Sequence, residues 1–286
     1  MQHLKIFIEL TRLNKPIGFM LLFWPCSWGL AYAYLINQDV NLFIYYLILF
    51  FFGSVLMRSA GCIVNDIVDK DFDKKVKRTK KRPLAAGKIS VMRSLLYVSI
   101  LCIFAFLILI QFNFFTICLG IGSMFLAFAY PFMKRITYWP QLFLGITFNW
   151  GIIMAWAAIN NDISAEIIIL YVSAIFWTLG YDTIYGAQDV SDDEIIGVKS
   201  TSIKFKNNIN MFVTLCYFFT FLILFFLLKK YLGFNITTFL FSFFNVSLIY
   251  QILNLKNSKK NNFLKMFKLN NISGLILFTA ILTINL

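Results

Sequence analysis

Nine long apolar runs decide which class of fold this chain can adopt. They lie near residues 16–36, 42–64, 91–111, 113–132, 139–159, 163–184, 210–228, 233–253 and 271–285. As helices, the first eight are long enough to cross a hydrocarbon layer of about 30 Å, and the last is the shortest. The sequence therefore predicts an all-α, polytopic membrane protein with one transmembrane domain over residues 1–286, a bundle of about nine helices.

The composition supports this class. The chain is 60% hydrophobic and 14% charged, whereas soluble domains are roughly 45–50% apolar and about 25% charged. A net charge of +13 would suggest nucleic acid as the partner of a soluble chain. In a membrane protein it reflects topology instead, so we expect no nucleic-acid partner. The five cysteines are scattered through apolar runs without a CxxC pair, which argues against a disulfide framework or a zinc site.

Lysine and arginine mark alternate connections between the runs. They crowd into residues 1–15, 70–93, 134–135, 199–206 and 256–268. The connections at 36–41 and 159–166 have none, and Lys229-Lys230 is the exception to the alternation. The positive-inside rule then places the N-terminus in the cytoplasm and the C-terminus outside. Because almost nothing precedes the first run, we expect a multi-pass protein of the bacterial inner (plasma) membrane rather than of an organelle.

Acidic residues gather at two points only. Of 13 Asp and Glu residues, nine lie within residues 66–73 and 182–194. Both stretches end apolar runs on the predicted cytoplasmic side, where the helix dipole is already negative. Carboxylates placed there need cations close by. The sequence therefore predicts two metal-binding faces that together hold a diphosphate in a cytoplasm-facing pocket.

If the helix continues through the first stretch, its spacing places most of the polar groups on one helical face. With Asn65 at zero and about 100° per residue, Asp69 falls near 40°, Asp73 near 80° and Asp66 near 100°, while Asp71 points away at about 240°. Oxygen ligands without His or Cys favour magnesium. The competing interpretation is a solvated acidic helix end, which does not explain a second copy on the same side.

The second stretch again forms one stripe, with Asp192 and Tyr185 beside it. With Asp182 at zero, Asp189 falls near −20° and Asp193 near +20°. Asp182 could alternatively be a buried, hydrogen-bonded residue that holds helices together.

Several polar residues inside or beside the runs are candidates for substrate contacts. Arg58 lies two turns deeper than Asn65, where an arginine is costly and by default functional. Tyr130 and Lys134 share a face at the end of their run, although an interfacial Tyr and a snorkelling Lys are the ordinary alternative. Asn149 is polar within an apolar run, and a helix-to-helix hydrogen bond is its ordinary role. Most basic loop residues are topology signals or lipid contacts, and a few should contact phosphate.

These motifs resemble a known family. Asn65-Asp66-x-x-Asp69-x-x-x-Asp73 resembles the first aspartate motif of the UbiA superfamily of intramembrane prenyltransferases, and Asp189-x-x-x-Asp193 resembles the second. Flanking segments resemble its 4-hydroxybenzoate polyprenyltransferase branch; they include residues 12–18, 57–66, 82–87, 130–135, 181–185 and 197–201. The similarity covers about residues 10–205.

The resemblance implies magnesium-dependent C-prenylation of 4-hydroxybenzoate by a long polyprenyl diphosphate, a step of ubiquinone biosynthesis, in a nine-helix bundle whose pocket opens laterally to membrane lipid. Magnesium would be held by Asn65, Asp69, Asp189 and Asp193. The catalytic residues would be Asp66, Asp69, Asp73, Asp189 and Asp193. The substrate-binding residues would be Arg12, Arg58, Lys74, Arg82, Tyr130, Lys134, Asn149, Asp182 and Lys199, with Arg58 on the acceptor carboxylate.

Two other functions compete with this one. Prenyl transfer to another acceptor (haem, naphthoate, homogentisate or a chlorin) would use the same aspartate geometry. A transporter would also carry intramembrane carboxylates, but near the bilayer midplane and often on broken helices. The clustering of these acids at one interface beside basic residues disfavours the transporter.

Overall fold

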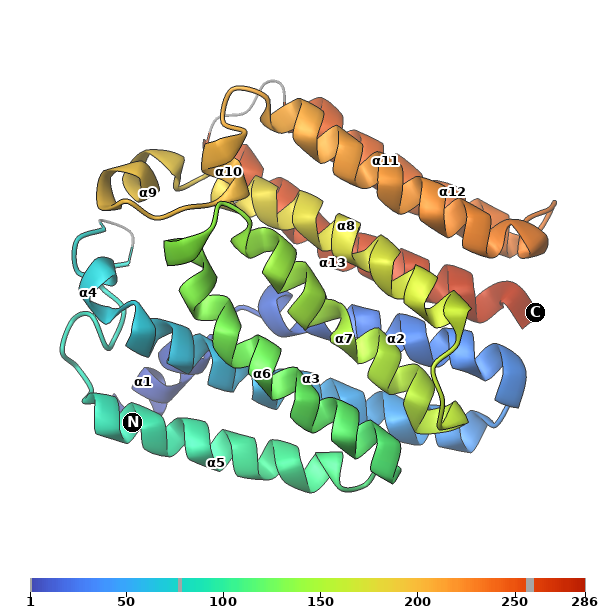
Figure 1. Cartoon of the computed structure of the whole chain (residues 1–286), viewed down its shortest axis with the longest axis horizontal. Coiled ribbons are helices and arrows are strands. Elements are labelled where there is room, and N and C mark those ends of the chain that lie inside the picture. Colours follow the sequence, from blue (N-terminus) through green and yellow to red (C-terminus); the bar gives the residue numbers. More distant parts are fainter. Residues whose placement is uncertain (1, 77–78, 256–259, 286) are drawn as a thin grey trace.

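The computed structural model describes residues 2–76, 79–255 and 260–285, and these form helices and connections without a strand. Nine long helices make up the bundle (Figure 1): α2 (Ile17–Asn37), α3 (Val40–Val68), α5 (Val91–Leu109), α6 (Phe114–Ile136), α7 (Pro140–Asn160), α8 (Ala165–Gly186), α11 (Ile209–Leu228), α12 (Ile236–Leu255) and α13 (Lys260–Leu282). The short elements are α1 (Gln2–Thr11), α4 (Lys70–Asp73), α9 (Val190–Ile196), α10 (Thr201–Lys204), η1 (Lys229–Tyr231) and η2 (Thr283–Asn285). The predicted all-α class is confirmed.

Within the described residues, eight helices are long and apolar enough to cross a membrane: α2, α3, α5, α6, α7, α8, α12, and α11 together with η1. The ninth predicted span differs from expectation. α13 begins at Lys260 rather than near residue 271, and Lys265, Lys268, Asn270 and Asn271 lower its hydropathy. It nevertheless runs alongside α8 through the bundle, and the N- and C-termini lie at opposite ends, as nine crossings require (Figure 1).

Local capping explains where several of these helices begin. The side chains of Asp39, Ser90, Asn113 and Ser164 each accept a hydrogen bond from the backbone N–H three residues later, at the starts of α3, α5, α6 and α8. Such residues satisfy one of the unpaired donors of a helix N-terminus. At the other end of α7, Asn161 adopts a left-handed backbone (φ 56°) and closes the last turn.

The centre of the bundle depends on close helix contact and internal hydrogen bonds. A Cβ on Gly29 of α2 would lie 2.5 Å from the Ile152 carbonyl oxygen of α7, so these two backbones approach closely. The indoles of Trp24, Trp28 and Trp177 donate hydrogen bonds of 2.8, 2.9 and 2.9 Å to α13. α13 is the least hydrophobic of the long helices, and these bonds give its polar groups partners within the protein. Lipid could not supply such partners.

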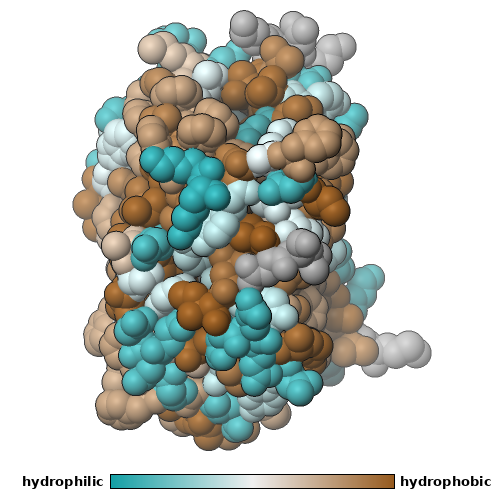
Figure 2. All heavy atoms as spheres, turned by 90° about the vertical axis from the view of Figure 1, so that its right-hand side faces the viewer, coloured by the Kyte–Doolittle hydropathy of each residue, from teal (hydrophilic) through white to brown (hydrophobic). Residues whose placement is uncertain are grey.

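The two acidic stretches lie at the same end of the bundle. The connections that carry α4, α9 and α10 meet there, at the end where the N-terminus also lies (Figure 1). Figure 2 shows the opposite end of the bundle, where hydrophilic residues gather between apolar flanks. The helix connections at that end carry the exposed residues Asp39, Asp162, Lys229 and Lys230. Four cations counted in the charge pattern, Lys77, Arg78, Lys256 and Lys259, lie outside the described residues.

Candidate functional site

The first acidic stretch turns one face inward, as its helical spacing predicts. α3 ends at Val68 and α4 begins at Lys70, but the turn continues because the N–H of Asp69 donates to Asn65 (2.9 Å) and that of Asp73 donates to Asp69 (2.8 Å). Asp66, Asp69 and Asp73 are buried, with 1%, 5% and 7% of their surface exposed. Asp71 points outward and forms an exposed ion pair of 2.9 Å with Lys74, which lowers the pKa of Asp71.

Cations from distant parts of the chain meet these carboxylates. Asp66 Oδ1 accepts hydrogen bonds from Arg12 Nη2 (2.6 Å) and Arg82 Nη1 (3.1 Å). The same Arg82 nitrogen donates to Asp73 Oδ2 at 2.8 Å. Burial raises the pKa of Asp73 above its ordinary value, while Arg82 acts in the opposite direction. Lys134 of α6 donates to Asp69 Oδ2.

Two side-chain oxygens of this cluster accept no hydrogen bond in the described residues. They are Asn65 Oδ1 and Asp69 Oδ1, and both are buried. Buried polar atoms without partners are rare and call for an explanation, of which an ion is one. Both are hard oxygen donors of the kind that magnesium prefers. The part of the chain that is described contains no preformed cluster of three His, Cys, Asp or Glu ligands, but magnesium commonly takes one or two carboxylates and completes its shell with water and substrate phosphate.

The second acidic stretch is not one continuous helix, so the predicted stripe from Asp182 to Asp193 is wrong. α8 ends at Gly186, and α9 begins only after Asp189. The backbone tightens at this point, because the N–H of Gln188 donates to Tyr185 (3.4 Å) and that of Asp189 to Gly186 (3.1 Å), three residues back rather than four. The Ser202 hydroxyl of α10 donates to the Thr183 carbonyl at 2.8 Å, so α10 lies beside the end of α8.

The break gives the aspartates of the second stretch separate positions. Asp189 is buried at the N-cap of α9, and Asp193 lies one turn later, with its N–H donating to the Asp189 carbonyl at 2.8 Å. Asp182 stays within α8.

A cavity of about 460 Å³ leads from the first stretch into the bundle between α2, α3, α5, α6 and α7. Arg58, Asn65 and Tyr130 contribute polar groups to its lining, and most of the rest is aliphatic or aromatic. α5 and α6 diverge from their connection toward the aspartate end (Figure 1). Phe106 and Phe128 line the cavity yet remain 51% and 53% exposed, so the cavity opens sideways between these two helices.

Arg58 is the deepest charged group of this cavity. Its Nε is buried and lacks a hydrogen-bond partner in the described parts of the chain. The guanidinium carbon lies 5.2 Å from the ring centre of Phe148. A Cβ on Gly18 would come within 3.0 Å of Nε, so glycine leaves room for the guanidinium. Asp182 interacts electrostatically with Arg58 from α8.

Of the predicted substrate contacts, only Arg58 and Tyr130 line the cavity. Arg12, Arg82 and Lys134 bond to aspartates of the first stretch, and Asp182 interacts with Arg58.

The other three have different partners. Lys74 pairs with exposed Asp71. Lys199 Nζ donates to the Ile136 carbonyl at 3.2 Å and lies over the ring of Tyr138.

The third is Asn149, which is fully buried. It donates at 2.7 Å to Gly145 of its own helix and, at 3.1 and 2.8 Å, to Ala174 and Thr178 of α8. In the structure, Asn149 therefore joins α7 to α8.

Arg135 belongs to the site although its sequence context did not single it out. Its Nη2 donates to the Val68 carbonyl at 2.8 Å and lies 3.8 Å from Asp69 Oδ1, and its guanidinium carbon lies 5.1 Å from the ring centre of Phe72. The predicted helical face contains Tyr130 and Lys134 but not Arg135. The signal in the sequence was the pair of adjacent cations, Lys134 and Arg135, at the end of the helix.

Comparison with known proteins agrees with this arrangement. Residues 22–272 match the model of the UbiA prenyltransferase family. The chain belongs to this family. Among solved structures it is similar to the apo structure of a UbiA homolog from Aeropyrum pernix K1, with a TM-score of 0.79, 22% identity, and coverage of 94% of this chain and 99% of that one. It is also similar to a UbiA homolog from Archaeoglobus fulgidus bound to GPP and Mg²⁺, with a TM-score of 0.68, 15% identity, and coverage of 98% and 99%. At these identities the likeness shows the shared fold.

Curated relatives are more similar in sequence. The mitochondrial 4-hydroxybenzoate polyprenyltransferase of Caenorhabditis elegans is 48% identical over 203 residues, which is 71% of this chain and 56% of that protein. The Homo sapiens protein of the same name is 46% identical over 208 residues, 72% of this chain and 55% of that protein. The match thus spans about half the length of these relatives.

Proposed function

We propose that this UbiA-family chain transfers a polyprenyl group from a polyprenyl diphosphate to the ring of 4-hydroxybenzoate, as a step of ubiquinone biosynthesis. The observation that carries the proposal is the position of the cavity. Its polar groups, Asn65, Arg58 and Tyr130, lie next to the clustered aspartates and cations, while its remaining lining is apolar and opens to lipid. The shared names of relatives at 43–48% identity support the choice of acceptor.

The diphosphate would bind at the aspartate end. Asn65, Asp69, Asp189 and Asp193 would hold magnesium, and the buried side-chain oxygens of the first two that accept no hydrogen bond fit hard-cation ligands. When bound, magnesium neutralises the charge of the departing diphosphate. Lys134 forms an ion pair with Asp69 beside this position, and its ammonium group would also bind a phosphate oxygen.

Arg12 and Arg82 would contribute positive charge beside the phosphates. Both guanidiniums are held on Asp66 and keep about a quarter of their side-chain surface exposed. A guanidinium has five donors in a rigid fork, so a bond to Asp66 leaves others for phosphate oxygens.

The prenyl group and the acceptor would meet next to Arg58. Breaking the allylic C–O bond leaves a carbocation, which needs aromatic faces and few water molecules. Tyr130 and Phe148 line this part of the cavity. Arg58 would bind the acceptor carboxylate, and the ring carbon next to the hydroxyl would form the new C–C bond and lose its proton.

The test uses purified membranes, a polyprenyl diphosphate, magnesium and 4-hydroxybenzoate, and follows the prenylated product with and without EDTA. We expect product that depends on metal and is lost in Asp69→Ala and Asp193→Ala. Asp71→Ala is the matched control, because that carboxylate points away from the site. Metal-dependent prenylation of a naphthoate, homogentisate, haem or chlorin in place of 4-hydroxybenzoate would overturn the acceptor but keep the chemistry. A folded protein without turnover on any acceptor would overturn the function.

The role of Arg58 has a separate readout. A lost charge-assisted contact is worth about 1.5–3 kcal/mol, so Arg58→Ala should raise the KM for 4-hydroxybenzoate by about 10- to 100-fold. Arg93→Ala, which removes an exposed arginine at the start of α5, should leave this KM unchanged. An unchanged acceptor KM in Arg58→Ala would show that the carboxylate binds elsewhere.

The membrane placement follows from the same geometry. We propose that the aspartate end and the N-terminus face the cytoplasm of a bacterial cell, because the described lysines and arginines concentrate at that end. Reporter domains fused to the two termini should report opposite sides of the membrane, and reporters on the same side would contradict this topology.

A further inference from the structure

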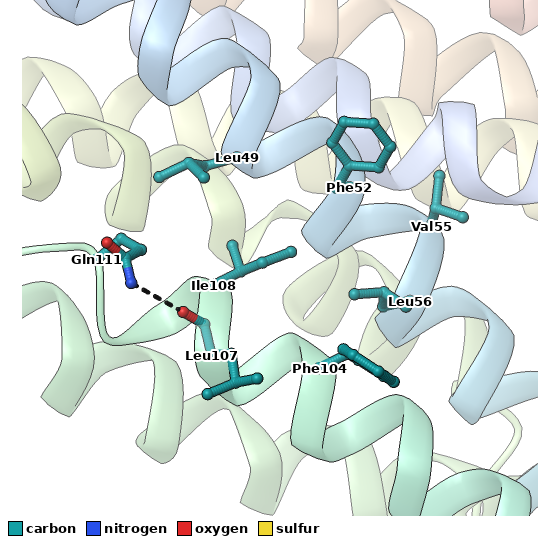
Figure 3. Close-up of a pocket in the computed structure, with 8 residues that line it drawn as sticks. All are labelled: Leu49, Phe52, Val55, Leu56, Phe104, Leu107, Ile108 and Gln111. Carbon is teal, nitrogen blue, oxygen red and sulfur yellow. Dashed lines mark hydrogen bonds between the residues drawn. The ribbon is translucent and has the colours of Figure 1, made fainter.

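A second apolar hollow lies on the outside of the bundle, between α3 and α5. Its volume is about 330 Å³. Figure 3 shows Leu49, Phe52 and Leu56 of α3 on one side, and Phe104 and Ile108 of α5 on the other. Phe52 and Phe104 are 54% exposed each, so this hollow is an open groove on the lipid-facing surface.

The groove shares a wall with the internal cavity. Leu49 and Ile108 line both spaces, and both side chains are half-buried. A single layer of two flexible aliphatic side chains therefore separates the groove from the cavity. Such side chains change rotamer readily, unlike a wall of packed backbone.

Along the bundle axis the far end of the cavity is closed, so a chain that passes this depth leaves either through the opening between α5 and α6 or across the wall shared with the groove. Along α3 the cavity extends from Asn65 to Leu49, sixteen residues or about 24 Å at 1.5 Å per residue. Phe50 and Phe112 lie at this depth, are only 6% and 8% exposed, and pack with their ring centres 4.9 Å apart. An extended chain that starts at the aspartates and exceeds this length must leave sideways.

We propose that the groove between α3 and α5 is a second subsite for the distal isoprene units of the polyprenyl chain, and that Leu49 and Ile108 form the wall this chain crosses. The inference rests on the proposed function, which places the diphosphate at the opposite end of the same cavity. The shared wall favours the polyprenyl tail as the occupant, because only a chain that begins inside the cavity would occupy the space on both sides of Leu49 and Ile108. A phospholipid acyl chain would occupy the groove alone.

The test compares prenyl diphosphates of different length on the intact protein in lipid nanodiscs. Leu49→Trp and Ile108→Trp thicken the wall, and Phe125→Trp is the control, since Phe125 is 78% exposed on α6 and lines neither space. We expect the two wall variants to raise KM about tenfold or more for an eight-unit diphosphate. They should leave KM for geranyl diphosphate, which is shorter than the cavity, unchanged. The control should change neither value.

A cross-linking experiment measures binding without turnover. A long polyprenyl diphosphate with a photoreactive group at its distal end should label the segments around Phe52 and Phe104, and Leu49→Trp should remove this labelling. Labelling confined to the segments around Phe106 and Phe128 would place the exit at the α5–α6 opening and overturn the proposal. So would equal losses for long and short substrates. No turnover of any length by the unchanged protein would instead refute the proposed function, so the two failures are distinguishable.

Discussion

Two ion pairs in the connection between α3 and α5 allow the effect of burial at the site to be measured directly. Arg82 Nη1 and Asp73 Oδ2 lie 2.8 Å apart, and Lys74 Nζ and Asp71 Oδ1 lie 2.9 Å apart. The side chains of the first pair are 23% and 10% exposed, whereas those of the second are 48% and 84% exposed. The pairs are thus matched in contact distance and in location, and differ in exposure.

The expected coupling energies follow from that difference. Exposed ion pairs contribute little, because water and salt screen both charges. For the Arg82–Asp73 pair, a hydrogen bond between charged groups is worth about 1.5–3 kcal/mol, and its low exposure limits screening, so we expect a coupling free energy of about 2 kcal/mol. We expect no measurable coupling between Lys74 and Asp71. Arg82→Ala should also destabilise more than Asp73→Asn, because the same nitrogen bonds to Asp66 at 3.1 Å.

The assay is a pair of double-mutant cycles on reversible unfolding in mixed micelles. One cycle combines Arg82→Ala with Asp73→Asn, and the other combines Lys74→Ala with Asp71→Asn. Each cycle isolates the pairwise term from the effects of the single substitutions. About 2 kcal/mol corresponds to roughly 30-fold in the unfolding equilibrium, which such measurements resolve. Equal coupling in both cycles, or none in the first, would refute the argument from burial.

Three further predictions concern packing, hydrogen bonding and metal. Gly29→Ala places a methyl group 2.5 Å from a backbone carbonyl of α7 and should cost about 1–3 kcal/mol of stability, while Gly122→Ala, with nothing within 4 Å, should not destabilise; thermal unfolding in detergent compares them. Asn270→Leu leaves a buried indole of α8 unpaired and should cost about 1–3 kcal/mol, and Asn254→Leu at the surface of α12, measured by the same method, should be close to neutral. Magnesium should raise the unfolding temperature of the unchanged protein but not that of Asp69→Ala, and an equal rise in both would argue against this ligand.

The sequence was sufficient for features that depend on local periodicity. The apolar runs predicted eight spans correctly, because spanning a membrane is mainly a requirement of length and hydrophobicity. The common face of Asp66, Asp69 and Asp73 followed from helical spacing, because the turn continues through Asp69. The outward direction of Asp71 followed in the same way.

Features set by tertiary partners could not be predicted. The position of α10 beside the end of α8 involves Ser202, whose hydroxyl reaches the Thr183 carbonyl from another helix. Arg135 reaches the carbonyl of Val68 across a chain separation of 67 residues. α1 is too short to register as an apolar run, yet Leu10 is fully buried against the bundle.

The first acidic stretch ties the proposed magnesium position to ion pairs that come from distant parts of the chain. Its carboxylates end a helix whose dipole already opposes them, and in the folded chain cations 54, 16 and 65 residues away relieve that repulsion: Arg12, Arg82 and Lys134. Arg12 and Lys134 come from distant segments, so their contacts form only once the end of α1 and α6 have packed against the stretch. Within the described chain, the buried oxygens Asn65 Oδ1 and Asp69 Oδ1 accept no hydrogen bond, and Arg135 lies 3.8 Å from the second. The proposed magnesium ion would therefore find its ligands selected by the ion pairs around it, and we expect that disrupting those pairs would weaken magnesium binding even where no ligand is changed.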